Sequence, residues 1–247
     1  MLATVNNVQL PYTTMTRLFF EPNNALTPIN RRFRHRSLDD LLQWSLLTYG
    51  DNLTQVTSFG PTGMVILDHL ARLSPGIRIV TIDTNFFFEE TYALWEKVQR
   101  RYPINLDIRQ TSLTPEAQAL ACGDELWNTD PDKCCHLRKV LPLQEALQGM
   151  DAWITGLRRD QSPTRTEIPL ITWDTKYQMV KLNPLTNWTN RQVWSYIVEH
   201  KLPYNPLHDQ GYASIGCTHC TQCTPDTSDE RSGRWRGRSK TECGIHT

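Results

Sequence analysis

The 247-residue sequence carries no net charge and no long apolar stretch. Its 26 Lys and Arg residues are balanced by 26 Asp and Glu residues. Any binding of anions must therefore come from local clusters of arginine, and the overall charge argues against a nucleic acid partner. Every apolar run is far shorter than the roughly 20 residues of a membrane-spanning helix, and the N-terminus lacks the pattern of a signal peptide. These absences predict a cytoplasmic protein with no membrane partner.

The sequence also lacks the cysteine pattern of a disulfide framework. Seven cysteines are an odd number, and in a reducing compartment cysteines more often serve metal binding or redox chemistry. With 39% hydrophobic residues, the chain can bury a full core. Its length favours one large α/β domain with an appendage over two equal domains.

Strand and helix patterns alternate along most of the chain. Ser37 begins a capping-box pattern that opens a helix, and Gly50 ends that helix. Further strands are predicted over Leu53–Thr57, Ile77–Ile82, Ile104–Ile108 and Ala152–Thr155, and further helices over Thr62–Leu73, Glu89–Arg101, Cys135–Gln148 and Thr189–His200. The alternation predicts an α/β fold with an open, mostly parallel sheet and helices on both faces.

The pattern divides the chain into three parts. Residues 1–30 form an arm with little periodicity, and residues 31–206 form the predicted α/β domain. Residues 207–247 hold few large aliphatic side chains and many Gly, Arg, Cys, Thr and Asp residues. Such a C-terminal segment cannot build a core of its own. We expect it to dock on the domain, to be stapled by a metal, or to stay mobile.

Two pairs of cysteines are candidates for a metal site. Cys134 and Cys135 are adjacent, and Cys217 and Cys220 form a CxxC motif about eighty residues later. Four thiolates are the number that a structural zinc ion or an iron–sulfur cluster needs, so the pattern alone leaves both open. Cys223 follows the CxxC motif closely, and we expect it to be an ordinary free thiol.

Groups that could bind phosphate follow the predicted strands, where open parallel sheets bind their ligands. The turn from Ser58 through Gly60 to Gly63 leads into a helix, so its amides could receive a phosphate. A plain turn between a strand and a helix explains this pattern equally well. Asp83 ends the second strand, where it could meet a nucleoside or merely cap a turn.

Two clusters of arginine lie farther along the chain. Arg158 and Arg165 belong to the loop after the strand that ends near Thr155, where arginines could clamp a phosphate or sulfate. Arg231 and Arg234 belong to a second cluster that also contains a tryptophan. Because the whole chain is neutral and the cluster is short, a small anion is favoured over RNA as its ligand.

Cys243 has the surroundings of a reactive thiol. It stands between Glu242 and His246 at the end of an arginine-rich stretch. The histidine and the arginines can stabilise a thiolate, whereas a carboxylate that points inward would oppose one. We therefore expect Glu242 to face solvent, and we expect the polar segment around Cys243 to be mobile.

These motifs together resemble the assimilatory adenylyl-sulfate/phosphoadenylyl-sulfate reductase family over residues 35–247. The matching segments are Ser58–Gly60, Ile82–Thr84, Glu90–Tyr92, Cys134–Val140, Ile154–Arg165, Lys181–Leu185, Leu202–His208, Cys217–Cys220 and Glu242–His246. The resemblance implies an adenine-nucleotide α-hydrolase-like fold. The two cysteine pairs resemble the form of the family that holds a [4Fe–4S] cluster and usually reduces adenosine 5′-phosphosulfate (APS). Members without these cysteines usually take the 3′-phosphorylated nucleotide (PAPS).

The resemblance also implies an activity and a set of site residues. The chain would reduce APS to sulfite and AMP through an S-sulfocysteine, in assimilatory sulfate reduction and cysteine biosynthesis. Thioredoxin or glutaredoxin would serve as the reductant, and a homo-oligomer stays open. The implied catalytic residues are Cys243, His246 and Lys139. The implied substrate-binding residues are Ser58, Gly60, Asp83, Arg158, Arg165, Arg231 and Arg234, and the implied cluster ligands are Cys134, Cys135, Cys217 and Cys220.

Some positions depart from the family pattern and keep alternatives open. Asn85 and Phe88 replace the usual Gly and Pro of the second-strand motif, which puts the adenosine contacts in doubt. The turn at Gly60 lacks the second serine of ATP-cleaving relatives, which argues against an ATP-dependent thiolation enzyme. A PAPS reductase is one alternative, and a zinc-stapled binding module without enzymatic activity is the other. Metal analysis separates the zinc module from the reductase, and a nucleotide assay separates the enzymes.

Overall fold

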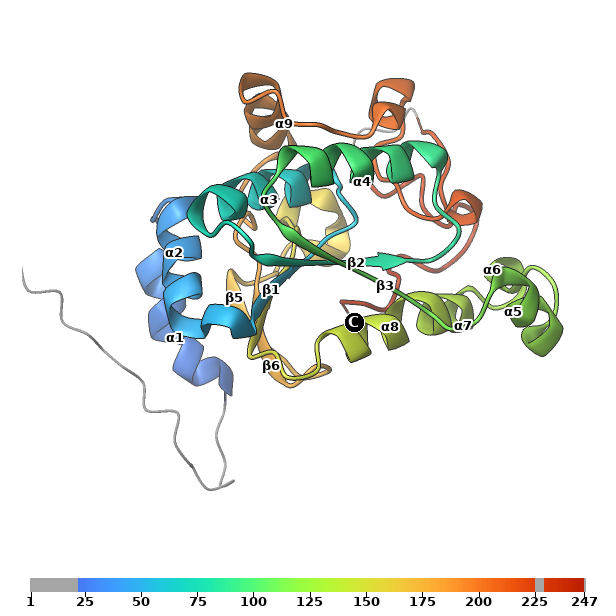
Figure 1. Cartoon of the computed structure of the whole chain (residues 1–247), viewed down its shortest axis with the longest axis horizontal. Coiled ribbons are helices and arrows are strands. Elements are labelled where there is room, and N and C mark those ends of the chain that lie inside the picture. The colour runs from blue at the N-terminus through green and yellow to red at the C-terminus, as the bar shows by residue number, and fades with distance from the viewer. Residues whose placement is uncertain (1–21, 225–228, 247) are drawn as a thin grey trace, which may run out of the picture.

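The computed structural model describes residues 22–224 and 229–246, which are arranged around a six-stranded sheet (Figure 1). The strand order is β3-β2-β1-β4-β6-β5. The strands are β1 (Leu53–Val56), β2 (Arg78–Asp83), β3 (Asn105–Gln110), β4 (Ala152–Ile154), β5 (Ile171–Asp174) and β6 (Met179–Leu182). All pairings are parallel except that β5 runs antiparallel to β6 at one edge. The predicted open, mostly parallel sheet is confirmed.

Helices cover both faces of this sheet. The helices are α1 (Pro22–Phe33), α2 (Leu38–Tyr49), α3 (Pro61–Leu73), α4 (Glu89–Arg101), α5 (Pro115–Cys122), α6 (Leu126–Thr129), α7 (Pro131–Cys135), α8 (Leu141–Ala146) and α9 (Asn190–Glu199). In Figure 1, α3 and α4 lie on one side of the strands and α8 lies on the other. No helix in the described ranges is long and apolar enough to cross a membrane.

Alternation along the strands produces two cores, one for each face. Ala152 and Ile154 of β4 point into the larger core, which they share with apolar residues of α2, α3, α4 and α9. Trp153, between them, points into the smaller core with Leu143 of α8. Because successive side chains of a strand point to opposite faces, a buried parallel strand reads as a continuous apolar run. This explains why the sequence marked β4 clearly.

Local signals in the sequence set the ends of several helices. The Ser37 hydroxyl accepts a hydrogen bond from the Asp40 amide, and the Ser37 amide donates to the Asp40 carboxylate, which completes the predicted capping box of α2. Thr189 does the same at α9. Pro61 occupies the first turn of α3, where the missing amide proton is not needed. These helices therefore begin where the sequence predicted, within one residue.

The structure also contains elements that the pattern did not reveal. Helix α1 overlaps the expected N-terminal arm, whose residues 1–21 lie outside the described part. Strands β5 and β6 and helix α5 were not predicted. The single helix expected over Cys135–Gln148 is instead three consecutive helical segments, because a π-helical turn spans His136–Val140 between α7 and α8. Such turns are frequent at functional sites.

The described part of the C-terminal segment docks on the domain. Cys217 forms an isolated antiparallel β-bridge with Phe87 of the domain. Thr221 forms another with Arg234 within the segment. Trp235 is buried, and Ile245 packs against the smaller core. The apolar side chains of the segment thus pack against the α/β domain. Docking on the domain was one of the three outcomes expected of such a polar stretch.

Candidate active site

A cavity of about 230 Å³ lies at the point where the strand order reverses. The chain leaves β1 toward β2 and β3, and it later adds β4 on the other side of β1. The loops after β1 and β4 therefore separate and open a crevice at the carboxyl ends of the strands, which is where open α/β sheets bind ligands. Both loops line the cavity, and the C-terminal segment closes it.

The cavity collects every predicted catalytic and substrate-binding residue except Asp83. Its lining includes Ser58 and Gly60 after β1, Arg158 and Arg165 after β4, Lys139 of the π-helical turn, and Arg231, Arg234, Cys243 and His246 of the C-terminal segment. These groups are spread over almost 190 residues of sequence. The fold brings these distant residues together in one crevice.

Asp83 caps a turn instead of lining the cavity. Its Oδ1 accepts hydrogen bonds from the Asn85 amide at 2.8 Å and from the Tyr92 hydroxyl at 2.9 Å. Ile82 is the residue of this strand end that lines the cavity. Asn85 has a φ of +60°, a left-handed conformation that Asn tolerates better than most residues. The exchange of Gly for Asn at this position is therefore compatible with the local backbone.

The turn after β1 requires a glycine for close packing. A Cβ on Gly63 would lie 2.3 Å from Thr57 Oγ1, and that hydroxyl accepts a hydrogen bond from the Phe59 amide at 2.9 Å. The first turn of α3 thus approaches the loop of β1 closely, with the helix N-terminus directed at the cavity. The amides and the dipole of a helix N-terminus attract anions.

Carboxylates already pair with several of the predicted arginines. Arg158 is buried and donates to Thr62, Asp160 and Glu230. Arg165 donates both Nε and Nη2 to the Glu242 carboxylate, each at 2.8 Å. The arginines are therefore held in fixed positions around the cavity, and part of their charge is compensated.

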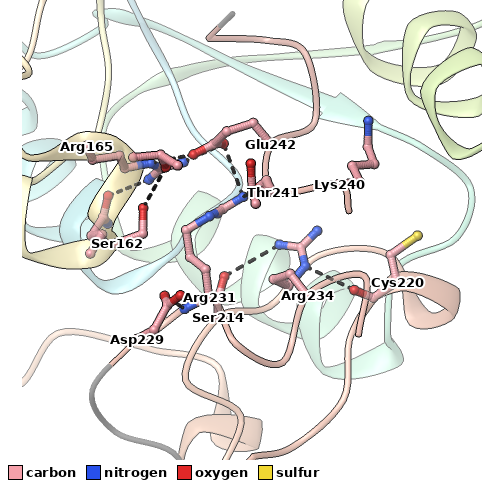
Figure 2. A network of polar contacts seen from close by, with 12 residues as sticks. Ser162, Arg165, Ser214, Cys220, Asp229, Arg231, Arg234, Lys240, Thr241 and Glu242 are labelled. Carbon is pink, nitrogen blue, oxygen red and sulfur yellow. Dashed lines mark hydrogen bonds and ion pairs between the residues drawn. The ribbon is translucent and has the colours of Figure 1, made fainter. Parts of the chain in front are cut away.

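The expectation that Glu242 faces solvent is wrong. Its carboxylate points inward between Arg165 and Arg231, as Figure 2 shows, and Arg231 Nη2 donates to it at 3.1 Å. Burial would raise the pKa of Glu242, but the hydrogen bonds from Arg165 and the charge of Arg231 hold it below its ordinary value. The cations at this point therefore keep the carboxylate ionised although it is buried.

Cys243 is partly exposed and lies in a cationic environment. Burial would raise the pKa of its thiol, but Lys139, a backbone hydrogen bond from Ile245, and the charges of Arg234 and Arg231 lower it below its ordinary value. For Lys139, burial acts to lower the pKa, whereas the Cys217 and Cys243 thiolates raise it above its ordinary value, so the amine stays protonated. The geometry favours a thiolate at Cys243.

His246 contributes shape to the site but no charge. Its ring stacks on Trp153 at 5.7 Å between centroids. Burial and the nearby charges of Lys181 and Arg165 hold the pKa of His246 well below its ordinary range, so the imidazole is neutral. Its Nδ1 is buried without a hydrogen-bond partner and is available to a ligand. The positive charge at Cys243 therefore comes from Lys139, Arg231 and Arg234.

The four predicted metal ligands line a second, much smaller cavity. Cys134 and Cys135 end α7, Cys217 precedes a 3-10 turn that ends at Cys220, and all four cysteines are buried. Burial raises the pKa of Cys134 to about 11 and that of Cys135 to about 12. Buried thiols of this kind become thiolates when a metal binds them. Cys223 is exposed and does not line this cavity.

Donors around these cysteines fit an anionic group. Arg138 Nη2 and Trp235 Nε1 are buried and have no hydrogen-bond partner. Thr84 Oγ1 lies 3.3 Å from Cys217 Sγ. Within the described ranges, no three His, Cys, Asp or Glu side chains lie close enough together to hold a single metal ion. The four thiols line this small cavity together with Arg138 and Lys139.

Sequence reasoning did not single out three of the residues that shape these cavities. Arg138 lies in the matching segment Cys134–Val140, but only its neighbour Lys139 was assigned a role from that segment. Trp235 is the one apolar side chain in an arginine-rich stretch, and Trp153 is a large aromatic in a predicted buried strand. An aromatic residue in an otherwise polar stretch is a signal that could have pointed to Trp235.

Comparison with known proteins gives consistent results. The phosphoadenosine phosphosulfate reductase domain family matches residues 52–223. A protein of Geobacillus thermodenitrificans named adenosine 5′-phosphosulfate reductase is 49% identical over 208 residues, which cover 84% of this chain and 88% of that protein. A protein of Salinibacter ruber with the same name is 46% identical over 227 residues, which cover 91% of this chain and 90% of that one.

Solved structures agree with the sequence comparison. A crystal structure of phosphoadenylyl-sulfate (PAPS) reductase from Candida auris, in a phosphate complex, matches with a TM-score of 0.74 and 34% identity. The match covers 85% of this chain and 99% of that chain. FMN adenylyltransferase from Candida glabrata matches with a TM-score of 0.54 at 17% identity, over 80% of this chain and 67% of that chain, and shares the fold alone.

Proposed function

The chain belongs to the phosphoadenosine phosphosulfate reductase family, and we propose that its larger cavity reduces adenosine 5′-phosphosulfate with Cys243 as the nucleophile. The relatives at 45–49% identity are named as reductases of this nucleotide, so the chain is an oxidoreductase that acts on APS. One observation carries the assignment of the nucleophile. Cys243 lines the cavity together with Lys139, Arg231 and Arg234, and these cations lower the pKa of its thiol.

The proposed reaction has two steps, and the thiol of Cys243 takes part in both. The thiolate attacks the sulfur of APS, an S–S bond forms, and the S–O bond to phosphate breaks as its electron pair leaves with AMP. A dithiol reductant such as thioredoxin or glutaredoxin then attacks Cys243 Sγ, and sulfite leaves with the electron pair of the S–S bond. The second thiol of the reductant displaces Cys243 and closes the reductant's own disulfide. The dithiol supplies both electrons.

The cations of the cavity have distinct tasks in the first step. Lys139 stands between the two cavities and lines both. There it can neutralise the sulfate group of the nucleotide and stabilise the thiolate of Cys243. The turn at Ser58 and Gly60 and the N-terminus of α3 offer amides to the phosphate. His246, neutral and stacked on Trp153, offers an imidazole nitrogen to the ligand without adding charge.

Lys139→Ala should reduce kcat/KM for sulfite release by about 10²-fold, the order expected for removing a buried charge-assisted contact from the transition state. The loss follows from the position of the amine beside Cys243. Steady-state kinetics with a thioredoxin system measures it. Lys97→Ala is the control, because Lys97 is an exposed residue of α4 and lies outside the cavity. Equal kinetics for the two variants would contradict the role of Lys139.

The preferred substrate is expected to be APS, with kcat/KM at least about 10²-fold higher than for PAPS. The names of the relatives support this choice. The structure adds a reason, because Glu230 and Glu242 already compensate Arg158, Arg165 and Arg231. Little unpaired cationic surface is then left for a second phosphate. Sulfite release measured with both nucleotides at equal reductant concentration tests the preference, and a higher value for PAPS would reverse it.

We also propose that Cys134, Cys135, Cys217 and Cys220 hold one [4Fe–4S] cluster. The adjacent Cys134 and Cys135 support a cluster over zinc, because tandem cysteines are atypical of zinc sites. When bound, the cluster would supply a compact anionic centre. Lys139 and Arg138 would balance its charge, and the unpaired donors Arg138 Nη2 and Trp235 Nε1 would have acceptors.

A further inference from the structure

The segment that carries Cys243 is attached to the protein by side chains. In the part of the chain that the structure describes, no hydrogen bond between main-chain atoms ties residues 239–246 to the rest of the fold. Lys240 pairs with Asp132, Lys176 donates to the Gly244 carbonyl, and Arg231 Nη2 donates to the Thr241 carbonyl at 2.9 Å. A segment held in this way can leave and return without any loss of secondary structure.

The Glu242 carboxylate makes the strongest of these attachments. Arg165 binds both of its oxygens in a bidentate pair, and Arg231 binds one of them as well, as Figure 2 shows. The side chain of Glu242 is 12% exposed, that of Arg165 is 8% exposed and that of Arg231 is 13% exposed. The Lys240 pair differs, because Asp132 is 81% exposed. Buried bidentate pairs hold their geometry far better than exposed pairs.

Electrostatics gives Glu242 no reason to be buried beside a nucleophilic thiol. A carboxylate next to Cys243 opposes the thiolate, so its inward position does not serve activation. The carboxylate instead fixes the position of the chain next to Cys243. Arg165 comes from the loop after β4 and Arg231 from an earlier part of the C-terminal segment, so the two salt bridges tie the residue before Cys243 to two separate parts of the cavity lining.

The salt bridges of Glu242 leave cationic groups free for a ligand to bind at the same time. Arg231 Nε is buried and has no hydrogen-bond partner, so this arginine keeps one unused donor near the cavity. Lys139 and Arg234 also line the cavity. An anionic nucleotide therefore meets cations that Glu242 does not occupy.

We propose that Glu242 is a positioning residue, a latch whose salt bridges to Arg165 and Arg231 hold the Cys243 segment in the substrate cavity. The inference rests on the proposed function only in treating Cys243 as the nucleophile. In the latched state Cys243 lies beside Lys139, ready to attack. Opening of the two salt bridges would free residues 239–246 to present the sulfonated thiol to a reductant.

Limited digestion with trypsin tests the latch without nucleotide and without turnover, because residues 239–246 contain one trypsin site, at Lys240. Glu242→Gln should increase the rate of cleavage after Lys240, followed by mass spectrometry, by about tenfold, and Glu242→Asp should give a smaller increase because the charge is retained. Glu96→Gln is the matched control, since it removes a carboxylate from an exposed pair with Arg100 on α4. Circular dichroism of each variant reports whether the fold is intact.

Arg165→Ala should reproduce the effect of Glu242→Gln on cleavage after Lys240, and the double variant should add little to either single one. A wild-type cleavage rate in a folded Glu242→Gln protein would overturn the latch. Equal increases in the cleavage rate from Glu242→Gln and Glu96→Gln would overturn it as well. Additive effects of the Arg165 and Glu242 variants would also count against it.

A kinetic readout separates the latch from the proposed function. In a single turnover with APS, Glu242→Gln should form S-sulfonated Cys243 at least about tenfold more slowly than wild type, while the nucleotide Kd changes less than about twofold. A variant that loses affinity instead, with an unchanged rate, would refute positioning. If wild-type protein itself gives no S-sulfonated Cys243, the proposed function fails, whereas the digestion result still decides the latch.

Discussion

Cys243→Ser is expected to abolish sulfite release, with a loss of at least about 10⁴-fold in kcat, the scale seen when an enzyme loses its nucleophile. A serine hydroxyl stays protonated at neutral pH, whereas Lys139, Arg231 and Arg234 lower the pKa of the Cys243 thiol. The side chains are nearly equal in size, so the cavity and its arginines should be unchanged. The variant should therefore bind the nucleotide and fail at the first chemical step.

Substrate labelled with radioactive sulfur makes this prediction specific. Wild-type protein should acquire a covalent label that a dithiol removes, and the Cys243→Ser protein should acquire none. Cys223→Ser is the control, because Cys223 is an exposed thiol outside both cavities. Labelling that persists in the Cys243 variant, or that disappears in the Cys223 variant instead, would show that another residue is the nucleophile.

Local patterns in the sequence predicted most of the α/β core. The strands β1, β2 and β4 lie where the sequence predicted them, and β2 and β4 contain short apolar runs. Strand β6 escaped because Lys181 interrupts its apolar residues. In the structure Lys181 is buried, 3.7 Å from Asp174 of the neighbouring β5. The carboxylate of Asp174 offsets the cost of burying this charge, and it reaches Lys181 only because β5 pairs with β6. Neither strand had a sequence signal strong enough to be recognised alone.

Helix α1 escaped for a related reason. Pro28 lies inside it, and a proline in a helical pattern normally signals an end or a kink. Side-chain bonds from Asn30 to the main chain of Ile171 anchor this helix against β5. Tertiary contacts therefore overrode the local signal, and no window of sequence contained both partners.

The chemistry of the site was easier to predict than the direction of its side chains. Motif residues converge on one cavity because strand ends and loops at a switch point must meet there. Glu242 points inward, against expectation, and Asp83 takes the turn-capping role that the sequence had left open, for a common reason. The sequence shows which charge a residue carries, but Tyr92 and the two arginines that decide its direction come from other elements. Side-chain direction in a site depends on partners that are distant in sequence.

Replacement of one of the four proposed cluster ligands is the second change for which we expect a large effect. Protein purified without oxygen should be brown, with broad absorption near about 400 nm and about four irons per chain. Cys217→Ser should remove the colour and the iron, because three thiolates cannot complete the set, and the variant should lose sulfite release almost entirely. Buried donors such as Arg138 Nη2 and Trp235 Nε1 would then lack an anionic partner. We therefore expect its unfolding temperature to fall as well.

Cys122→Ser is the matched control for this loss. Cys122 ends α5 and does not line the cavity of the four cysteines, so its variant should keep both iron and activity. Zinc analysis on the same samples separates the two metals that four thiolates can bind. Colourless wild-type protein that holds one zinc ion and releases sulfite at full rate would refute the cluster. Because Lys139 lines both cavities, iron loss and slow S-sulfonation of Cys243 should appear together in the Cys217 variant.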